Sequence, residues 1–335
     1  MIFIDNEGNN DPHLNLALEE YIVRNFKDKD YLLFYINKPS IIIGRNQNTL
    51  EEVNQSYVEE KGIHVVRRIS GGGAVYHDFG NLNFSFITDH DIKSFNNFKK
   101  VTAPIVKVLN DMGVKAEMKG RNDVVVNDRK ISGNAQFSTG KRMFTHGTLL
   151  LNSDLEEVTR ALQVKMSKIA SKGHKSVRSR VANIQEFLEE PLDILEFREL
   201  ILKGLDAAGD FETYTLTEED WKAVYELKES KYDQWDWNYG RSPKSNIQRE
   251  KRFPIGSIDL RLWIEKGHIA TVKIFGDFFN SQPISELEDI LTGVRYTKED
   301  VHNALKEVDL NNYFNTLPKE DFEDLVYGED DLIEE

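Results

Sequence analysis

The sequence contains no cysteine among its 335 residues. This absence excludes disulfides, thiolate metal ligands and every mechanism with a cysteine nucleophile, and it is consistent with a reducing cytoplasm. Long apolar runs are also absent, because stretches such as YLLFYI and SIIIG are far too short to span a bilayer. The N-terminus lacks the basic and apolar segments of a signal peptide. We therefore expect a cytoplasmic protein that does not act at a membrane.

Basic residues are outnumbered, with 43 Lys and Arg against 57 Asp and Glu and a formal net charge of -14. An acidic average field repels nucleic acid, so we expect no nucleic-acid partner. Hydrophobic residues make up 39% and aromatic residues 10% of the chain, which is enough for a packed core. The length suggests about two domains.

The patterning predicts an α+β fold, with strands and helices interleaved along the chain. Leu14, Leu18, Ile22 and Phe26 recur at helical spacing and predict a helix over 13–26. Short β-branched or apolar runs predict strands, and longer polar-apolar patterns predict further helices. Single strands are predicted at 31–36, 40–44, 64–70 and 145–152, and two strands around a turn at Gly80-Asn81 are predicted within 74–87. The predicted helices are 49–62 and 96–113.

A second patterned region follows a predicted linker at 235–253, which is rich in turn-forming residues. Strands are expected at 257–267 and 268–275, followed by helices at 284–293 and 297–308. The segment 319–335 has nine acidic residues and one basic residue, and we expect a marginal helix with a solvated end. These patterns predict a larger domain over 1–245 and a smaller one over 246–335 that carries the acidic tail.

Three consecutive glycines, Gly71 to Gly73, follow a predicted strand. Glycine lets backbone N–H groups approach an anion closely, and Arg67 and Arg68 stand just before the run. A strand rather than a helix follows it, and neither the dinucleotide-binding nor the P-loop motif is completed. A glycine run alone is more often a tight corner, but the flanking arginines favour an anion or nucleotide site.

The segment 121–133 is typical of a β-hairpin with Asn127-Asp128 as its two-residue turn. With that turn, Asp123 is expected to pair with Ser132. Since side chains alternate along a strand, Asp123, Lys130 and Ser132 should share one face, with Val125, while the other face belongs to the core. A half-exposed surface ion pair is an equally simple interpretation of the same pattern.

The eight histidines show no close metal-ligand spacing, so we expect no protein-bound zinc, and no GxSxG elbow supports a serine hydrolase. His77 and His146 are candidates for polar contacts near a site, and the other histidines are expected to be structural or on the surface. The segment 158–185 carries seven basic and no acidic residues. A solvated face is the common explanation of such a run, and contact with phosphates is the alternative.

Several linked motifs together resemble the lipoate–protein ligase A family of the biotin/lipoate ligase superfamily. They occur in family order and spacing over nearly the whole chain, including a C-terminal part that looks like the accessory domain of the family. The motifs are NLALEEY, IIIGRNQN, RRISGGGAVYHDFGNLNFSF, GRNDVVVNDRKISGNAQ, THGTLLLN, SVRSRVANI and GHIATVKIFGDFF.

The resemblance implies a mixed β-sheet catalytic domain with a small C-terminal α/β domain, and an ATP-dependent ligase. Lipoate and ATP would form lipoyl-AMP and pyrophosphate. The lipoyl group would then pass to a lysine of an acceptor, such as the lipoyl domains of 2-oxoacid dehydrogenase complexes or the glycine cleavage H protein. Mg²⁺ would accompany ATP.

By position within these motifs, the resemblance implies roles for individual residues. Lys130 corresponds to the lysine that contacts both nucleotide and lipoate, and we expect it to be catalytic. The expected ATP-binding residues are Arg68, Gly73, Ala74, Val75, Tyr76 and Lys130. The expected lipoate-binding residues are Lys130, Ser70, Gly71, Gly72, His77, Tyr35 and His146. Asp123 is the candidate for holding Mg²⁺, from its expected face on the hairpin.

Two enzymatic alternatives and one non-enzymatic alternative stay open. ATP-independent octanoyl or lipoyl amidotransferases use a cysteine nucleophile, which this chain lacks. The glycine- and arginine-rich signature of biotin ligases is also missing. A non-catalytic lipoate- or nucleotide-binding module would not need both Lys130 and the glycine run.

Overall fold

The structure is a computed structural model that describes residues 1–91, 93–95, 97–162, 180–207, 209–240, 247–265 and 267–327. The chain forms two compact units. The N-terminal unit comprises Met1–Ile43, Leu50–Arg68 and Ala74–Asn238. The C-terminal unit comprises the residues from Tyr239 onward, together with Gly44–Thr49 and Ile69–Gly73. The sequence-based division at 245/246 did not anticipate that these two short segments group with the C-terminal residues.

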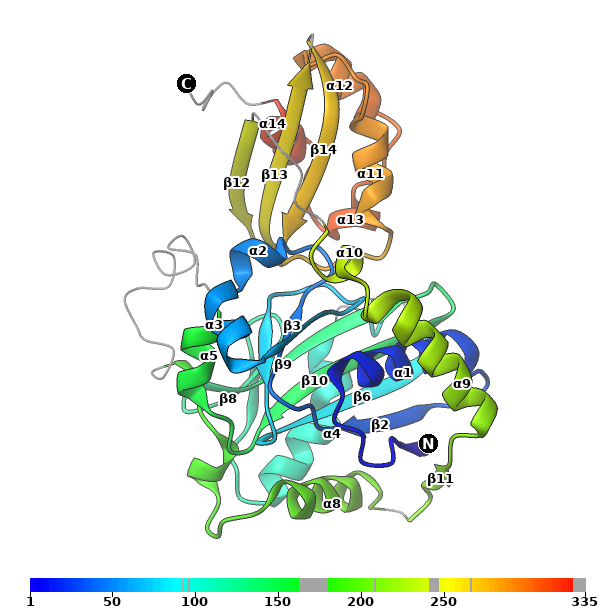
Figure 1. Ribbon diagram of the computed structural model, residues 1–335, viewed down its shortest axis with the longest axis vertical. Helices are drawn as coiled ribbons and strands as arrows, with labels where there is room; N and C mark the ends of the chain where they lie inside the picture. The colour runs from blue at the N-terminus through cyan, green and yellow to red at the C-terminus, as the bar shows by residue number, and fades with distance from the viewer. Residues whose placement is uncertain are drawn as a thin grey trace. The chain divides into compact units, whose positions relative to one another are not determined.

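Within the described residues, the N-terminal unit is built on an eight-stranded mixed sheet in the order β11-β1-β2-β6-β10-β9-β8-β7 (Figure 1). β1 pairs in parallel with β2 and with β11, and the other pairs are antiparallel. This confirms the predicted mixed sheet. The strands are β1 (Ile2–Asp5), β2 (Tyr31–Tyr35), β6 (Asn81–Asp89), β7 (Glu117–Lys119), β8 (Asp123–Val126), β9 (Arg129–Ser138), β10 (Arg142–Leu150) and β11 (Glu212–Tyr214).

One face of this sheet carries the apolar core of the unit. Phe34, Phe84 and Leu149 are fully buried there, with side chains from α4 (Phe98–Asp111) and α8 (Ile194–Leu205). Helix α4 presents Ile105, Val108 and Leu109 at the i, i+3, i+4 spacing that places them on one side. Burial of this apolar surface is the main stabilising term of the unit.

The opposite face of the sheet contacts α1 (Pro12–Asn25), which packs on β6 and β10. Asp11 caps this helix by accepting a hydrogen bond from the N–H of His13 at 3.0 Å. The predicted helix is confirmed, except that Phe26 lies just beyond its end. Helix α9 (Glu218–Leu227) packs against α1 (Figure 1) and continues into η2 (Lys228–Tyr232) and α10 (Trp235–Asn238).

A small sheet in the order β4-β3-β5 completes the N-terminal unit. Its strands are β3 (Ser40–Ile43), β4 (His64–Arg67) and β5 (Val75–His77). The predicted single helix over 49–62 is wrong, because the chain forms α2 (Thr49–Glu52) and α3 (Gln55–Lys61) instead. Val53 leaves the helix to form a β-bridge with Leu162, and Asn54 then caps α3. Among the residues that the structure describes, the remaining short elements of this unit are α5 (Leu155–Ala161) and η1 (Ile184–Phe187).

In the C-terminal unit, the antiparallel strands β12 (Ile247–Phe253), β13 (Gly256–Glu265) and β14 (His268–Gly276) form a sheet. The predicted strands at 257–267 and 268–275 are therefore confirmed. Its helices are α11 (Ile284–Leu291), α12 (Lys298–Leu305), α13 (Asn311–Phe314) and α14 (Lys319–Val326). The predicted linker over 235–253 is wrong at both ends, because it holds α10 and β12. Residues 241–246 of that linker and 328–335 of the acidic tail lie outside the described residues.

Candidate active site

The hairpin that carries Lys130 has the predicted two-residue turn. Asn127 and Asp128 both have positive φ, 50° and 64°, as a type I′ turn requires. Val126 pairs with Arg129 and Val125 pairs with Lys130, as predicted. The first two residue pairs of the hairpin thus follow from its turn chemistry.

Beyond Val125 the predicted register is wrong. A β-bulge shifts the pairing by one residue, so that Val124 pairs with Ser132 and Asp123 pairs with Gly133. Ile131 is the extra residue, and its side chain is buried in the core. As a result Ser132 lies fully buried beside Val124, and Gly133 takes the place predicted for Ser132 on the Lys130 face.

Lys130 and Asp123 form an ion pair on this face. Lys130 Nζ lies 2.7 Å from Asp123 Oδ1, and each side chain is about one third exposed, at 34% and 36%. The carbonyl of Lys130 accepts a hydrogen bond from the N–H of Ala182 at 2.9 Å, which fixes the backbone independently of the ion pair. The lysine is therefore anchored at its backbone and presents its amine at an accessible edge of the site.

From this ion pair, a row of polar and small residues crosses the sheet face. Asp123 pairs with Gly133, which donates its N–H to Thr148 Oγ1 at 3.1 Å. Thr148 pairs with Asn83, and Asn83 pairs with Tyr35. Directly paired residues have side chains on the same face. The register therefore places the predicted residues Asp123 and Tyr35 on the same side of the sheet, on strands β8 and β2.

A buried, closely contacting histidine and glutamate lie next to this row. His146 lies two residues before Thr148 on β10, and it pairs with Ser85. Its Nδ1 lies 3.0 and 2.9 Å from the two carboxylate oxygens of Glu19 on α1. Both side chains are nearly inaccessible. Burying a carboxylate is costly unless it is paired and hydrogen-bonded, so His146 and Glu19 depend on each other.

Arg68 follows β4, and its guanidinium is buried. Its Nη1 donates to the carbonyl of Ile42 at 3.0 Å, and its backbone N–H donates to the carbonyl of Ile43. Burial lowers the pKa of Arg68 to about 10, and the nearby Tyr35 and Glu19 oppose that change. Arg68 therefore remains a cation at neutral pH, in a setting of low dielectric where its charge acts strongly.

Tyr35 and His77 belong to the same electrostatic cluster. Burial and the Glu19 carboxylate raise the pKa of Tyr35 well above its usual range, so its hydroxyl stays protonated. Burial lowers the pKa of His77 to about 3, with smaller contributions from Arg68 and His146. His77 Nδ1 lies 3.0 Å from the amide nitrogen of Asn37. Since that amide donates, neutral His77 carries its proton on Nε2, which makes no hydrogen bond to any other described residue.

The buried neutral histidine predicts a specific pH dependence of stability. In the unfolded chain His77 takes up a proton below pH 6.5, whereas in the folded protein it does so only near pH 3. The unfolded state therefore binds more protons in this window, and the free energy of unfolding falls by about 1.4 kcal/mol per pH unit below 6.5. Urea denaturation of the wild type and of His77→Gln at pH 7.0, 6.0, 5.0 and 4.5 measures this slope. Equal slopes for both proteins would contradict the assignment.

The glycine run belongs to the C-terminal unit, where its three glycines differ in their surroundings. A Cβ on Gly71 would lie 2.4 Å from the carbonyl oxygen of Phe278, and Gly72 has a positive φ of 92°. Both positions therefore require glycine for packing or conformation. Gly73 has neither constraint, because a Cβ there would meet nothing within 4 Å. The glycines at 71 and 72 are therefore explained by the tight turn that the chain makes there.

This difference predicts opposite outcomes for two similar variants. Gly71→Ala must move backbone atoms, and we expect it to lower the free energy of unfolding by about 1–3 kcal/mol. Gly73→Ala should change stability by less than about 0.5 kcal/mol, and the ATP-binding role predicted for Gly73 predicts a raised KM for ATP. Urea denaturation and ATP saturation curves test both. Equal stability losses in the two variants would contradict the distinction.

The remaining predicted ATP residues lie along β5 and just before it. Ala74 and Val75 are half-buried, and Tyr76 is buried, with burial and Asp78 raising its pKa. Arg67 is fully buried, and its guanidinium donates to the carbonyls of Trp237 and Asn238. These hydrogen bonds engage the Arg67 guanidinium with the backbone of α10. Of the basic run, residues 163–179 with Lys165, Lys168, Lys172, Lys175 and Arg178 lie outside the described residues.

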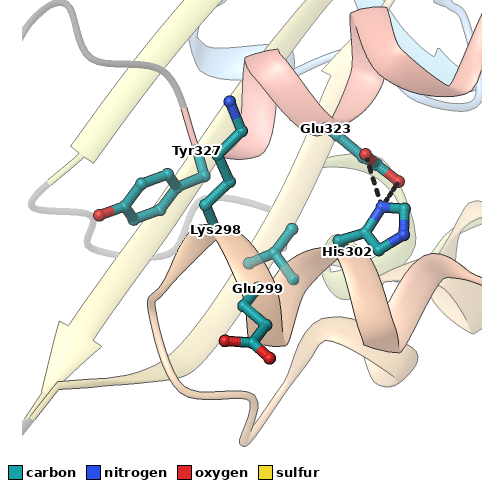
Figure 2. A pocket seen from close by; sticks show the side chains of 6 residues that line it. Lys298, Glu299, His302, Glu323 and Tyr327 are labelled. Carbon is teal, nitrogen blue, oxygen red and sulfur yellow. Dashed lines mark hydrogen bonds and ion pairs between the residues drawn. The ribbon is translucent and has the colours of Figure 1, made fainter.

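Three pockets among the described residues are lined by none of the predicted site residues. Figure 2 shows one in the C-terminal unit, about 380 Å³ in volume, with His302 Nδ1 3.1 Å from both carboxylate oxygens of Glu323. Its other lining residues are Lys298, Glu299, Val301 and Tyr327. In the part of the chain that the structure describes, no helix has both the length and the apolar character needed to cross a membrane.

Sequence reasoning missed Asn83, Thr148 and Gly133 on the polar sheet face, and Glu19 on the helix that packs against it. Glu19 lies on α1 and reaches His146 on β10, a contact that only the packing of that helix establishes. Asn83 stands between Leu82 and Phe84 on β6, and Thr148 is followed by Leu149 and Leu150 on β10. A buried polar residue in such a strand was the available signal for both.

The residues in the described ranges fit Mg²⁺ only in a limited way. They contain no group of three or more carboxylate or imidazole side chains that could hold a metal ion. Asp123 offers one carboxylate, and its Oδ1 is already paired with Lys130. Mg²⁺ is commonly bound by one or two carboxylates together with substrate phosphates. Asp123 could contribute one carboxylate to a Mg²⁺ ion that substrate phosphates also bind.

Comparison with protein families gives two consecutive matches. Residues 11–206 match the lipoyl protein ligase A/B catalytic domain, and residues 242–326 match the bacterial lipoate protein ligase C-terminus. The chain is 55% identical over 331 residues to lipoate-protein ligase LplJ of Bacillus subtilis, covering 98% of this chain and 100% of the relative. It is 54% identical to lipoate–protein ligase 1 of Staphylococcus aureus, covering 95% and 98%.

Solved structures show the same fold. P. falciparum LipL1 in complex with lipoate matches with a TM-score of 0.78 and 26% identity, covering 96% of this chain and 97% of that one. A lipoate-protein ligase A bound with ATP matches with a TM-score of 0.60 and 30% identity, covering 72% and 97%. A bipartite Thermoplasma acidophilum ligase, studied with its E2 lipoyl domain, matches at 0.64 and 33%, covering 73% and 98%. The chain therefore belongs to the lipoate–protein ligase family, as its motifs predicted.

Proposed function

We propose that this ligase activates lipoate with ATP and transfers it to protein by using Lys130 at the junction of acyl group and phosphate. In the first step the lipoate carboxylate attacks the α-phosphorus of ATP, which forms lipoyl-AMP and releases pyrophosphate. In the second step the amine of an acceptor lysine attacks the acyl carbon, which forms an amide and releases AMP. The match to lipoate-protein ligases over nearly the whole chain, and to a ligase structure bound with ATP, supports ATP-dependent ligation.

The chemistry of both steps calls for a fixed cation. A carboxylate is a poor electrophile until it is joined to phosphate. Negative charge builds on the phosphate oxygens during adenylation and on the acyl oxygen during transfer. A preorganised positive group beside the shared acyl–phosphate bond stabilises both transition states.

The observation that carries the proposal is the Lys130–Asp123 ion pair at one end of the polar row on the sheet. A backbone hydrogen bond and a tight turn fix the strand, while the amine stays partly exposed and can reach a ligand. An ammonium also suits a point contact with phosphate. Asp123 would hold that amine in place before the substrates bind.

We assign the other predicted residues to the two substrates. Arg68 would contact the ATP phosphates, together with the segment Gly73, Ala74, Val75 and Tyr76. The lipoate side of the site would be formed by Tyr35, His77 and His146, with Ser70, Gly71 and Gly72. The buried protonated Tyr35 and neutral His77 support this assignment, because neither adds a negative charge beside an anionic substrate.

Mg²⁺ would be held by the triphosphate oxygens with Asp123 as a single protein carboxylate. When bound, the ion would offset part of the negative charge on the triphosphate. We propose lipoyl domains of 2-oxoacid dehydrogenase complexes and the glycine cleavage H protein as acceptors. The archaeal relative studied with an E2 lipoyl domain supports the first of these. A cytoplasmic location, where ATP is available, completes the proposal, and cell fractionation tests it.

Incubation of the chain with ATP, Mg²⁺, lipoate and an isolated lipoyl domain tests the proposed function. We expect mass spectrometry to show addition of one lipoyl group to the acceptor, and no addition when ATP is left out. Modification of the acceptor from lipoyl-protein without ATP would favour the amidotransferase alternative. Binding of lipoate without any modification would favour the non-catalytic module.

A further inference from the structure

Gly133 lies directly beneath the amine that the proposed mechanism uses. A Cβ built at this position would lie 2.7 Å from Lys130 Nζ and 2.9 Å from Lys130 Cε, closer than such atoms approach in proteins. The Lys130 side chain therefore occupies the space that any side chain at 133 would need. Its path to the Asp123 carboxylate crosses the bare backbone of Gly133.

The β-bulge is what brings a glycine to this position. In a hairpin without the bulge, Ile131 would pair with Val124 and Ser132 would stand opposite Asp123, with its hydroxymethyl group on the face of Lys130. With the bulge, Ser132 turns toward the core and Gly133 stands opposite Asp123. Bulges often re-aim side chains next to active sites.

We infer that Gly133 is a positioning residue for Lys130, and that the bulge and the glycine together set where the amine stands. This inference rests on the proposed role of Lys130. Gly133 touches no substrate in this account. It acts by leaving room for the lysine stem, so that the amine meets Asp123 and the acyl–phosphate junction at once.

Two observations indicate that an alanine at position 133 would displace the Lys130 amine without disturbing the packing of the protein. The atoms in conflict are the far end of a flexible side chain that is one third exposed, so Lys130 can move aside when a methyl group is added. The φ of Gly133 is not positive, so alanine can adopt its backbone conformation. Gly133→Ala should therefore fold normally while its amine is displaced by about 1 Å, and misplacement of that size can slow a reaction about 100-fold.

Three variants test the inference: Gly133→Ala, Lys130→Ala and the double variant. Each is compared with the wild type for its thermal midpoint and for the single-turnover rate of lipoyl-AMP formation with enzyme in excess. We expect Gly133→Ala to keep the wild-type midpoint and to lose about 100-fold in rate. We expect the double variant to be as slow as Lys130→Ala and no slower, because two residues that act through one amine are not additive.

The outcomes separate this inference from the proposal beneath it. A wild-type rate for Lys130→Ala overturns the proposed role of the lysine itself. Loss in Lys130→Ala with a wild-type rate in Gly133→Ala overturns the role of the glycine alone. A double variant slower than Lys130→Ala shows that Gly133 acts independently and also overturns it. Should Gly133→Ala fail to fold, recovery of folding in the double variant supports the steric conflict, and failure of both contradicts it.

Discussion

Lys130→Ala is expected to lower the rate of lipoate-dependent exchange between pyrophosphate and ATP by about 100- to 1,000-fold. The expectation follows from removing one preorganised group that stabilises developing negative charge, an effect of this size in other enzymes. The fold should survive, because the lysine is partly exposed and its ion pair with Asp123 is of the kind that contributes about 1 kcal/mol or less. The backbone hydrogen bond from Ala182 is unaffected by the substitution.

Lys119→Ala is the matched control for this variant. Lys119 lies on the neighbouring strand β7 and forms an exposed ion pair with Asp128 in the turn of the same hairpin. Removing it takes away a hairpin ion pair without touching the site amine. We expect Lys119→Ala to exchange pyrophosphate at the wild-type rate. A normal exchange rate in Lys130→Ala, or equal losses in both variants, would remove Lys130 from the centre of the mechanism.

Arg68→Met is expected to raise the KM for ATP by about 10- to 100-fold. Hydrogen bonds to charged groups contribute about 1.5–3 kcal/mol each, which corresponds to this range. Methionine preserves much of the apolar stem of the buried arginine, whereas alanine would leave a cavity and confound binding with stability. ATP saturation curves of pyrophosphate exchange, at saturating lipoate, measure the effect.

Arg67→Met supplies the comparison, because the two arginines are adjacent and both buried. The guanidinium of Arg67 is bonded to the carbonyls of Trp237 and Asn238, so its loss should lower the free energy of unfolding. The folded fraction of Arg67→Met should keep the wild-type KM for ATP. A raised KM in Arg67→Met together with an unchanged KM in Arg68→Met would reverse our assignment of the two residues.

Much of the fold followed from local patterns. The apolar spacing of Leu14, Leu18 and Ile22 predicted α1, and the Asn127-Asp128 turn predicted the hairpin and its first two pairs. These features depend on residues close together in the chain. The predicted helix over 49–62 failed because Val53 forms a bridge with Leu162, a contact with a distant residue that no local pattern records.

The sequence could nominate residues for the candidate site but could not predict their geometry. Motifs pointed to Lys130, Arg68 and Asp123, and alternation along the hairpin correctly placed Lys130 and Asp123 on one face. The bulge at Ile131 could not be predicted, because burying its side chain in the core decides the register there. The pairing of Glu19 with His146 likewise depends on how α1 packs on the sheet. The bonds of the Arg67 guanidinium to the carbonyls of Trp237 and Asn238 also join segments that are distant in the sequence.

A crystal structure of the protein with a non-hydrolysable sulfamoyl analogue of lipoyl-AMP tests the central claim most directly. The account predicts that Lys130 Nζ lies within about 3 Å of the group that replaces the phosphate, which is hydrogen-bonding distance. It also predicts that Asp123 remains in contact with the same amine. An analogue bound elsewhere, with the amine of Lys130 directed into solvent, would contradict it.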